Sequence, residues 1–454
     1  MNFRDDFVWG AATSSYQIEG AQDEGGKGPH LWDEYVKEKN DKIFENQRGD
    51  TSCDHYHRFR EDVALMKELG LKAYRFSVDW TRIIPEGTGK VNEEGIAFYD
   101  ALIDELVAND IEPYLTLFHW ELPMELYKRG GWMNPQMPEW FAAYAALIAD
   151  RFSDRVKNFF TINEPQCFVG LAFSEGVHAP WLQLPNSQTL LMSHNALKSH
   201  GRAIQELRAH ARQPLTLGFA PTSGIALPAT EKPEDIEAAR QAYFGIPQEG
   251  TWAWNTSWWS DPVILGHYPD EFLRHFWKEL PKITDEDLKI ISQPIDIYGQ
   301  NIYLGYPVRM GDDGKPELLS RNTGYAKSAS NWPMTPDCLY WGPKFLYERY
   351  KKPLFITENG LACHDWVHLD GKVHDSSRID FTARYLKSLS RAAAEADIRG
   401  YFAWSLMDNF EWAEGFGQRY GLVFVDFQTQ RRIPKDSAYW YREVIRTNGE
   451  CIEG

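Results

Sequence analysis

Short apolar runs alternate with longer amphipathic stretches along most of the chain. Each short run is rich in β-branched and aromatic residues and ends on polar or aromatic groups, as in residues 354–360, which read Leu-Phe-Ile-Thr-Glu-Asn-Gly. Such runs are typical of parallel strands that are covered on both faces. The pattern predicts eight strands, within residues 7–20, 73–78, 112–120, 158–165, 215–220, 296–303, 354–360 and 400–408.

The stretches between these runs carry apolar residues at helical spacing. In residues 54–69, Phe59, Val63 and Met66 recur on one helical face, and Gly70 ends the pattern. Alternating strands and helices favour an α/β fold with a parallel sheet, and eight repeats favour a closed (β/α)8 barrel of the TIM type. Further helices are predicted at 95–108, 138–152, 189–209 and 379–396.

No linker and no second hydrophobic unit interrupts this alternation. We therefore expect residues 1–454 to form a single domain. Three longer excursions, at 20–53, 224–292 and 308–353, are expected to be loops. They would roof the carboxyl-terminal face of the barrel, where the working groups of such barrels lie.

Charged residues stand at or inside three of the predicted strands. Glu164 and Glu358 each fall at the carboxyl end of a strand, and Pro165 stops the first of these strands because proline cannot donate to a ladder. Arg75 lies among apolar neighbours in another strand, where an unpaired charge would be very costly. A carboxylate in the barrel mouth is its expected partner.

Two glutamates on opposite sides of a sugar ring can hydrolyse a glycosidic bond, because one protonates the leaving oxygen while the other attacks the anomeric carbon. A carboxylate beside a fixed cation stays ionised and suits the nucleophile, whereas one in an apolar pocket keeps its proton. Asn163 and Asn301 can fix a substrate hydroxyl, and Tyr303 can donate to the nucleophile. A single glutamate at a strand end could equally form a structural salt bridge, but two with amides beside them favour catalysis.

Composition supports a carbohydrate substrate and disfavours other partners. Aromatic residues make up 14% of the chain, with 18 Trp, and rings at strand ends suit the apolar faces of sugars. The net charge of −17 argues against nucleic acid and anionic membranes as partners. Residues 1–6 lack the apolar core of a signal peptide, no run could span a bilayer, and the five scattered cysteines resemble free thiols. A cytoplasmic location is therefore expected.

Metal and cofactor motifs are weak in this sequence. His55, His57 and the group at 363–374 contain ligand types without a typical zinc or calcium spacing. No glycine-rich phosphate loop opens a helix, and Gly-Xaa-Ser-Xaa-Gly is absent. We expect neither a metal nor a cofactor.

Four motifs resemble those of glycoside hydrolase family 1, the β-glucosidases, and the resemblance covers nearly the whole chain. They are residues 7–20, 161–165 (Thr-Ile-Asn-Glu-Pro), 356–360 (Ile-Thr-Glu-Asn-Gly) and 404–412 (Trp-Ser-Leu-Met-Asp-Asn-Phe-Glu-Trp). The resemblance implies a retaining exo-β-glycosidase with Glu358 as nucleophile and Glu164 as acid/base, whose carboxyls lie about 5–5.5 Å apart. Its implied substrates are terminal β-D-glucosides, including short β-linked oligosaccharides from cellulose, with galactosides and fucosides as further candidates.

The resemblance also implies roles for the residues that bind the sugar. Gln17 and Glu411 would bind hydroxyls at carbons 3, 4 and 6, and Trp404 would form the stacking floor. His119, Asn163 and Trp412 would bind the hydroxyls at carbons 2 and 3. Trp120 would stand beside them, and Trp332 would line the aglycone side.

Several positions depart from the family's pattern. Glu121 stands where the family usually has Asp before Leu-Pro, Trp181 stands where Gly usually follows His-Ala-Pro, and residues 331–339 differ from the usual loop. The ring of Trp181 would stand in a loop near the entrance and leaves the aglycone preference open, and the changed loop leaves the shape of the roof open. Glu411 stands where the phospho-glycosidase branch typically has a small residue, and its charge would repel a 6-phosphate. An unphosphorylated sugar is therefore expected.

Other functions share this pattern. A transglycosylating member would have the same site if aromatics on the acceptor side favoured a sugar over water, and a 6-phospho-β-glycosidase would have the same fold. A catalytically silent sugar-binding barrel tends to lose one of the two glutamates, and this chain has both Glu164 and Glu358. A homo-oligomer is one assembly that the sequence allows.

Overall fold

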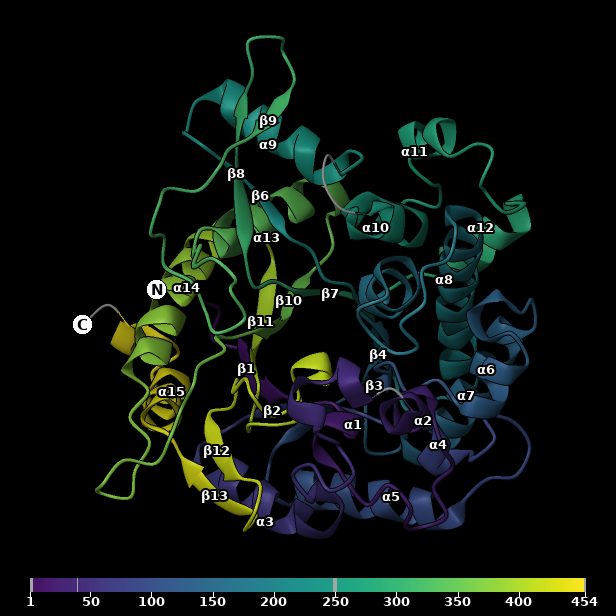
Figure 1. Cartoon of the computed structure of the whole chain (residues 1–454), viewed down its shortest axis with the longest axis vertical. Helices are drawn as coiled ribbons and strands as arrows, with labels where there is room; N and C mark the ends of the chain where they lie inside the picture. The colour runs from purple at the N-terminus through teal and green to yellow at the C-terminus, as the bar shows by residue number, and fades with distance from the viewer. Residues whose placement is uncertain (1–2, 39, 248–250, 453–454) are drawn as a thin grey trace.

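The computed structural model describes residues 3–38, 40–247 and 251–452. Met1 and Asn2, which begin the charged amino-terminal stretch, lie outside this range, as do residues 39 and 248–250 of two of the excursions. Eight parallel strands close into a barrel in the order β1-β11-β10-β7-β5-β4-β3-β2 (Figure 1). The predicted (β/α)8 fold is thus confirmed. The strands are β1 Val8–Ala12, β2 Ala73–Ser77, β3 Glu112–Phe118, β4 Asn158–Asn163, β5 Thr216–Ala220, β7 Ile297–Asn301, β10 Leu354–Asn359 and β11 Ile398–Trp404.

The helices predicted from apolar spacing are all present, with bounds that differ by a few residues at most. The last strand begins two residues earlier than expected, at Ile398, and ends at Trp404. The confirmed helices are α3 His55–Glu68, α5 Glu93–Ala108, α7 Met137–Phe152, α8 Asn186–Ala209 and α14 Ser376–Ala393.

The excursion at 308–353 is more than the loop that we expected. It contains α13, Cys338–Tyr350, which packs against α14 and leads into β10 as a regular helix of the barrel wall. Gly342 and Pro343 lie inside this helix, and in the sequence this pair resembles the signal that ends a helix. Leu339, Phe345 and other apolar side chains nevertheless bury one face of it. Burial against the barrel therefore outweighs the weak local propensity.

The other excursions also contain regular elements. Residues 20–53 hold α2 Leu31–Glu38, and residues 224–292 hold β6 Ile225–Pro228, α9 Pro233–Phe244, α10 Thr256–Ile264, α11 Asp270–His275 and α12 Asp285–Ile291. Strand β6 joins β8 Gly305–Met310 and β9 Pro316–Leu318 in a three-stranded sheet, which lies beside α9 above the barrel in Figure 1. Beyond the last barrel strand come the hairpin strands β12 Val423–Asp426 and β13 Arg431–Pro434, and then α15 Asp436–Arg446.

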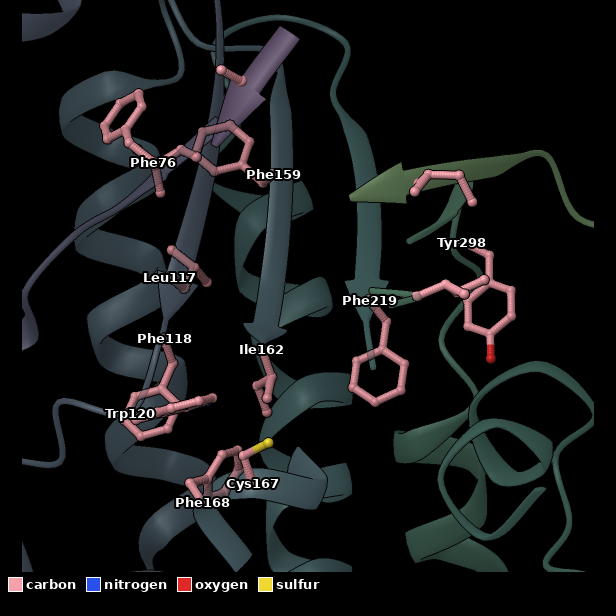
Figure 2. Close-up of a cluster of buried hydrophobic side chains, with 14 of the residues drawn as sticks. Phe76, Leu117, Phe118, Trp120, Phe159, Ile162, Cys167, Phe168, Phe219 and Tyr298 are labelled. Atoms are coloured by element: carbon pink, nitrogen blue, oxygen red, sulfur yellow. The ribbon is translucent and has the colours of Figure 1, made fainter. Parts of the chain in front are cut away.

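Alternate residues of each strand serve two separate cores. In β4, Phe159 points outward and packs between the strands and the helices, together with the side chains in Figure 2. Phe160 belongs instead to the cluster inside the barrel, with Tyr114 and Phe402. Because neighbouring strand residues face opposite sides, burial on both sides makes these strands mostly apolar. Apart from Arg75 in the middle of β2, their charged residues lie at or near the strand ends.

Candidate active site

The two predicted glutamates lie at neighbouring places in the barrel mouth. Glu164 directly follows β4, and Glu358 is the fifth residue of β10; their side chains are nearly buried. The backbone of Glu164 has φ 44°, a conformation that non-glycine residues retain only where the surroundings fix it. Both carboxyls line one cavity of about 770 Å³.

Glu358 is held by a cation and a hydroxyl. The guanidinium of Arg75, which is 1% exposed, donates from Nη1 to Glu358 Oε1 at 2.7 Å. The hydroxyl of Tyr303 donates to the other oxygen, Oε2, at 2.8 Å. Burial and the charge of Glu358 raise the pKa of Tyr303 far above its usual value, so this hydroxyl keeps its proton and donates. The carboxylate partner predicted for Arg75 is therefore confirmed.

Among the described residues, the side chains that contact Glu164 are neutral. Asn301 donates from Nδ2 to Glu164 Oε1 at 2.8 Å, and the thiol of Cys167 donates to Oε2 at 3.1 Å. Cys167 was missed in the sequence, although it follows Glu164 by three residues and is the second residue of the π-helix Gln166–Glu175. A residue one helical turn beyond a catalytic candidate is a signal that could have identified it.

The protonation of the two carboxyls is linked. Burial raises the pKa of Glu164, and burial together with the charge of Glu164 raises the pKa of Glu358 to about 7. Arg75 and Tyr303 oppose the rise at Glu358 because they stabilise its ionised form. Two such carboxyls titrate as a pair and bind one proton close to neutral pH. Since only Glu358 contacts a cation, the shared proton belongs on Glu164.

Asn163 connects both catalytic candidates to a histidine. Its Oδ1 accepts from Arg75 Nη2 at 2.6 Å and from Asn301 Nδ2 at 3.1 Å, so its Nδ2 must face His119 Nε2, 3.2 Å away. Burial and the charge of Arg75 lower the pKa of His119 far below its usual value, and the ring is neutral. It carries its proton on Nδ1, which has no hydrogen-bond partner among the described residues.

Aromatic rings surround the glutamates. His119 lies nearly parallel to Trp404, with ring centroids 5.8 Å apart, and Trp120 lies 4.4 Å from Trp412. Flat rings of this kind provide stacking surfaces for the apolar faces of a sugar. Trp332 is 40% exposed at the mouth and meets Tyr303 edge-on at 5.3 Å.

Glu411 and Gln17 lie together on the far side of the cavity. Gln17 donates from Nε2 to Glu411 Oε2 at 3.3 Å and to Asn409 Oδ1 at 2.9 Å, while Ser14 donates to its Oε1 at 2.6 Å. Burial and the charges of Glu358 and Glu164 raise the pKa of Glu411 to about 8. In the described part of the chain no cation contacts this carboxyl.

The structure brings all the predicted site residues together in two layers. Four of them, Arg75, Asn301, Gln17 and Asn163, lie behind the cavity wall and contact the residues that form it. Tyr420, Glu175 and Trp254 also line the cavity and were not predicted. The predicted residues that line it are Glu164, Glu358, Tyr303, His119, Trp120, Trp332, Trp404, Glu411 and Trp412.

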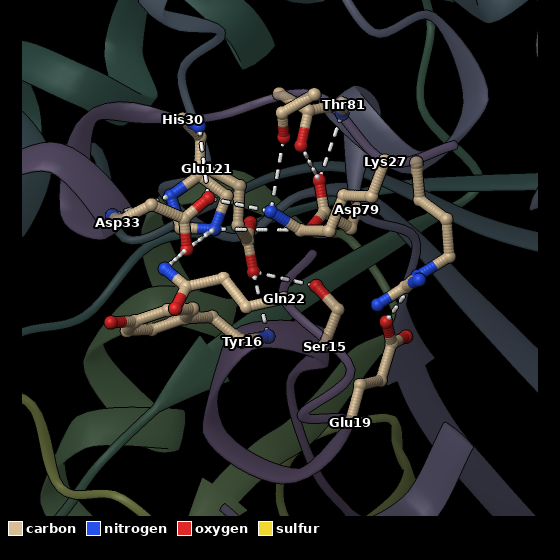
Figure 3. A network of polar contacts seen from close by, with 12 residues as sticks. Ser15, Tyr16, Glu19, Gln22, Lys27, His30, Asp33, Asp79, Thr81 and Glu121 are labelled. Atoms are coloured by element: carbon tan, nitrogen blue, oxygen red, sulfur yellow. Dashed lines mark hydrogen bonds and ion pairs between the residues drawn. The ribbon is translucent and has the colours of Figure 1, made fainter. Parts of the chain in front are cut away.

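Glu121 joins the amino-terminal segment to the barrel. Its Oε1 accepts from Ser15 Oγ at 2.6 Å and from the Tyr16 backbone at 3.2 Å, and its Oε2 accepts from the His119 backbone at 3.3 Å. Figure 3 shows it within a buried network that includes Asp79. Burial and the charge of Asp79 raise the pKa of Glu121 to about 8. This departure from the family's pattern therefore lies in a buried network and is not part of the cavity lining.

Trp181 also lies away from the cavity that we expected it to border. Its ring is half-buried and packs 6.0 Å from Trp32 and 6.2 Å from Tyr35, and it is not part of the cavity lining. The larger residue after Pro180 fills a space between α2 and the π-helix. It therefore gives no information on the aglycone.

The described residues contain neither a metal-binding cluster nor a helix suited to a membrane. Within residues 3–38, 40–247 and 251–452, no cluster of three or more His, Cys, Asp or Glu is arranged to hold a metal ion. In the same residues, no helix combines the length and the apolar character that crossing a membrane requires. His374, from the group at 363–374, is bonded instead to Asp370 and Asp436.

Comparisons with known proteins agree on one family. The family model of Glycosyl hydrolase family 1 matches residues 1–450. Beta-glucosidase A of Acetivibrio thermocellus is 40% identical over 99% of both chains, and Beta-glucosidase A of Thermotoga maritima is 39% identical over 98% of both chains. The structure of a Thermotoga maritima β-glucosidase in complex with glucoimidazole superposes with a TM-score of 0.90 at 39% identity, over 99% of both chains.

Proposed function

The chain belongs to glycosyl hydrolase family 1 and is a β-glucosidase, and from this premise we propose that Glu358 is the nucleophile and Glu164 the acid/base of a retaining reaction. The observation that carries the assignment is the contrast between their partners. Arg75 donates to Glu358 at 2.7 Å and favours its ionised form, whereas Glu164 accepts from the neutral side chains of Asn301 and Cys167 and has no contacting cation among the described residues. A nucleophile needs the charge and an acid needs the proton.

The first half of the reaction forms an ester. A carboxylate oxygen of Glu358 attacks the anomeric carbon, the bond from that carbon to the leaving oxygen breaks, and Glu164 gives its proton to that oxygen. The aglycone leaves as an alcohol, and Glu164 becomes the ionised partner. Because the ester of Glu358 is neutral, the proton affinity of Glu164 is no longer raised by a neighbouring charge.

The second half restores the enzyme. Glu164 takes a proton from water, the water oxygen attacks the anomeric carbon, and the ester bond to Glu358 breaks. Two inversions give a β-glucose product. We propose a separation of about 5–5.5 Å between the two carboxyls, as a direct attack without an intervening water requires.

The substituents of the sugar meet the residues that the family resemblance implied. We propose that Gln17 and Glu411 bind the hydroxyls at carbons 3, 4 and 6, that His119 and Asn163 bind those at carbons 2 and 3, and that Trp404 stacks on the ring. The neutral His119 supports this, because its Nδ1–H is a donor without a protein partner in the described structure. Galactosides and fucosides fit the same set of contacts less completely.

Replacing the acid/base should remove the alkaline limb of the pH profile. Since Glu164 carries the shared proton, the alkaline loss of kcat/KM on nitrophenyl β-glucoside reports the ionisation of Glu164, whose pKa is raised by burial. The amide in Glu164→Gln cannot ionise, so we expect its residual activity to fall on the acid side alone, where Glu358 takes up a proton. The acid limb should stay in place, because Glu164 is still protonated, and therefore neutral, when Glu358 ionises.

The matched control for this experiment is Glu175→Gln. Glu175 lines the same cavity but is bonded to Trp254 Nε1 at 2.7 Å and not to the catalytic pair. Its alkaline limb should remain. An alkaline limb that persists in Glu164→Gln, or one that disappears in both variants, would show that Glu164 does not carry the proton of the acid.

A 6-phosphorylated β-glucoside should be a poor substrate. Its dianion would lie beside the half-buried Glu411, which has no contacting cation in the described structure. Leaving a buried charge uncompensated costs about 3–5 kcal/mol, so we expect kcat/KM to be roughly 10²- to 10⁴-fold lower than for the plain nitrophenyl β-glucoside. Glu411→Ser should narrow this ratio, while Glu414→Ser, at the same cavity, should leave it unchanged. Greater activity on the phosphorylated substrate would place the chain in the phospho-glycosidase branch.

We also propose that the chain is one domain and works in a reducing compartment, the cytoplasm. All five cysteines are free thiols, and Cys53, Cys167 and Cys338 are buried. Closure of the barrel between the first and last strands supports a single domain.

A further inference from the structure

The cavity that holds the two glutamates continues into a side arm. Its volume of about 770 Å³ lies in the upper part of the range for ligand pockets, about 300–1,000 Å³, and exceeds what one sugar ring fills. The arm extends toward α9 and the sheet formed by β6, β8 and β9. Its lining consists of Ala226, Ala242, Tyr243, Tyr306, Val308 and Leu318.

Four of these lining residues share one face of the sheet. Strands β6 and β8 pair in parallel with Ala226 opposite Tyr306, and β8 and β9 pair antiparallel with Val308 opposite Leu318. Because Tyr306 and Val308 are two positions apart on one strand, their side chains lie on the same side. The register therefore turns one continuous apolar face toward the cavity.

The opposite face of the sheet is covered by the barrel wall. Ile225 is the neighbour of Ala226 on β6 and points to the other side, where its side chain lies 2.8 Å from the position of a Cβ at Gly342 in α13. α9 packs against all three strands. The sheet is thus enclosed by α13 and by α9, except where the cavity reaches its apolar face.

Large apolar side chains are exposed where this arm opens. Tyr306 is 43% exposed, Leu318 is 37% exposed, and Trp332, on the same cavity, is 40% exposed. Exposed apolar groups that gather at one cavity mark a binding surface, whereas single ones need no explanation.

Three polar side chains beside the arm are already engaged within the protein, whereas the buried hydroxyl of Thr251 has no hydrogen-bond partner among the described residues. Thr222 donates to the Asn301 carbonyl at 3.0 Å, and Ser223 bonds to the Tyr243 hydroxyl at 2.8 Å. Asn255 caps α10 by accepting from the Trp258 backbone N–H at 2.6 Å. A second sugar placed here would find few partners for its hydroxyls along the apolar wall, and burying such groups unpaired is costly.

We propose that this arm binds the aglycone of a β-glucoside whose alcohol is long and apolar, such as an alkyl chain or an aryl-alkyl group. The inference rests on the proposed function, because Glu164 must protonate the oxygen that joins the sugar to this chain. Glu164 and Leu318 line one cavity, so a chain that starts at the anomeric oxygen can extend along this cavity to the sheet.

Butyl, hexyl and octyl β-D-glucosides provide a direct test. Their leaving alcohols have nearly the same acidity, so the demand on Glu164 is constant and a change in kcat/KM reports binding of the chain. We expect kcat/KM to rise roughly two- to four-fold per added methylene, since a fully buried CH₂ contributes about 0.8 kcal/mol. All substrates would be used below the concentration at which they form micelles, with cellobiose measured alongside.

Two leucines form a matched pair of variants. Leu318 lines the arm and is 37% exposed, whereas Leu265, at the end of α10, is 40% exposed and outside the cavity lining. Leu318→Asn should remove most of the chain-length dependence, lower kcat/KM for the octyl glucoside about tenfold and leave cellobiose unchanged. Leu265→Asn should behave as the wild type on every substrate.

The outcomes separate this inference from the proposed function. Hydrolysis of all three alkyl glucosides at one rate, or an equal loss on cellobiose and octyl glucoside in Leu318→Asn, would overturn the apolar arm and leave the β-glucosidase assignment intact. Failure to hydrolyse any β-glucoside, including an activated aryl glucoside, would overturn the proposed function itself.

Discussion

Glu358→Ala should lower kcat on nitrophenyl β-glucoside on the order of 10⁶-fold, the scale seen when an enzyme loses its covalent nucleophile. The substituted side chain can neither attack the anomeric carbon nor stabilise positive charge that develops there. Release of nitrophenol under saturating substrate is the measurement. Residual activity within about a hundredfold of the wild type would contradict the role assigned to Glu358.

A second variant separates chemistry from structure at this position. Glu358→Ala leaves the buried Arg75 without its carboxylate, and breaking a buried pair costs about 3–5 kcal/mol. Glu358→Gln keeps an oxygen that can accept from Arg75, so it should be as inactive but better folded. Calorimetric titration with glucose or cellobiose should show binding close to that of the wild type. Loss of binding in Glu358→Gln would mean that the residue acts in substrate recognition.

Glu164→Ala should slow mainly the hydrolysis of substrates whose leaving group needs a proton. General acid catalysis contributes roughly 10²- to 10⁴-fold, so cellobiose and alkyl glucosides should slow by about this factor. The first step on dinitrophenyl β-glucoside should remain fast, because dinitrophenolate leaves without a proton. Its overall turnover should then be limited by hydrolysis of the ester, where the missing base is required.

Azide gives the decisive measurement for Glu164→Ala. This anion needs no base to attack, and the removed carboxylate makes room for it beside the anomeric carbon. We expect azide to accelerate turnover and to yield a β-glucosyl azide. The control is Glu175→Ala, which should show no such product. An α-glucosyl azide, or no azide product in Glu164→Ala, would exclude Glu164 as the acid/base of a retaining reaction.

The positions of the catalytic candidates were predictable because they follow from strand ends. A buried parallel strand is mostly apolar, so a carboxylate at its carboxyl end marks the barrel mouth, as at Glu164 and Glu358. The partner of Arg75 was predictable for a related reason, since a charge inside an apolar strand must be compensated.

Other features depend on contacts that local sequence does not encode. Helix α13 contains Gly342 and Pro343 and is stabilised by burial against α14 and the barrel. The place of Trp181 is set by Trp32 and Tyr35, more than 140 positions earlier in the chain. The apolar arm depends on the pairing register of β6, β8 and β9, and short strands in long excursions carry little periodicity from which a register could be predicted.

The closure of the barrel between β1 and β11 has a consequence for the newly made chain. β1 pairs with β11 along its whole length, and Gln17 meets Glu411, a separation of 394 positions. A ribosome-bound chain that has emerged only as far as β10 would contain both glutamates but neither a closed barrel nor a complete sugar pocket. We infer that binding of sugar begins only after β11 has left the ribosome. Until then, the edge of β1 that pairs with β11 is exposed to chaperones or to other chains.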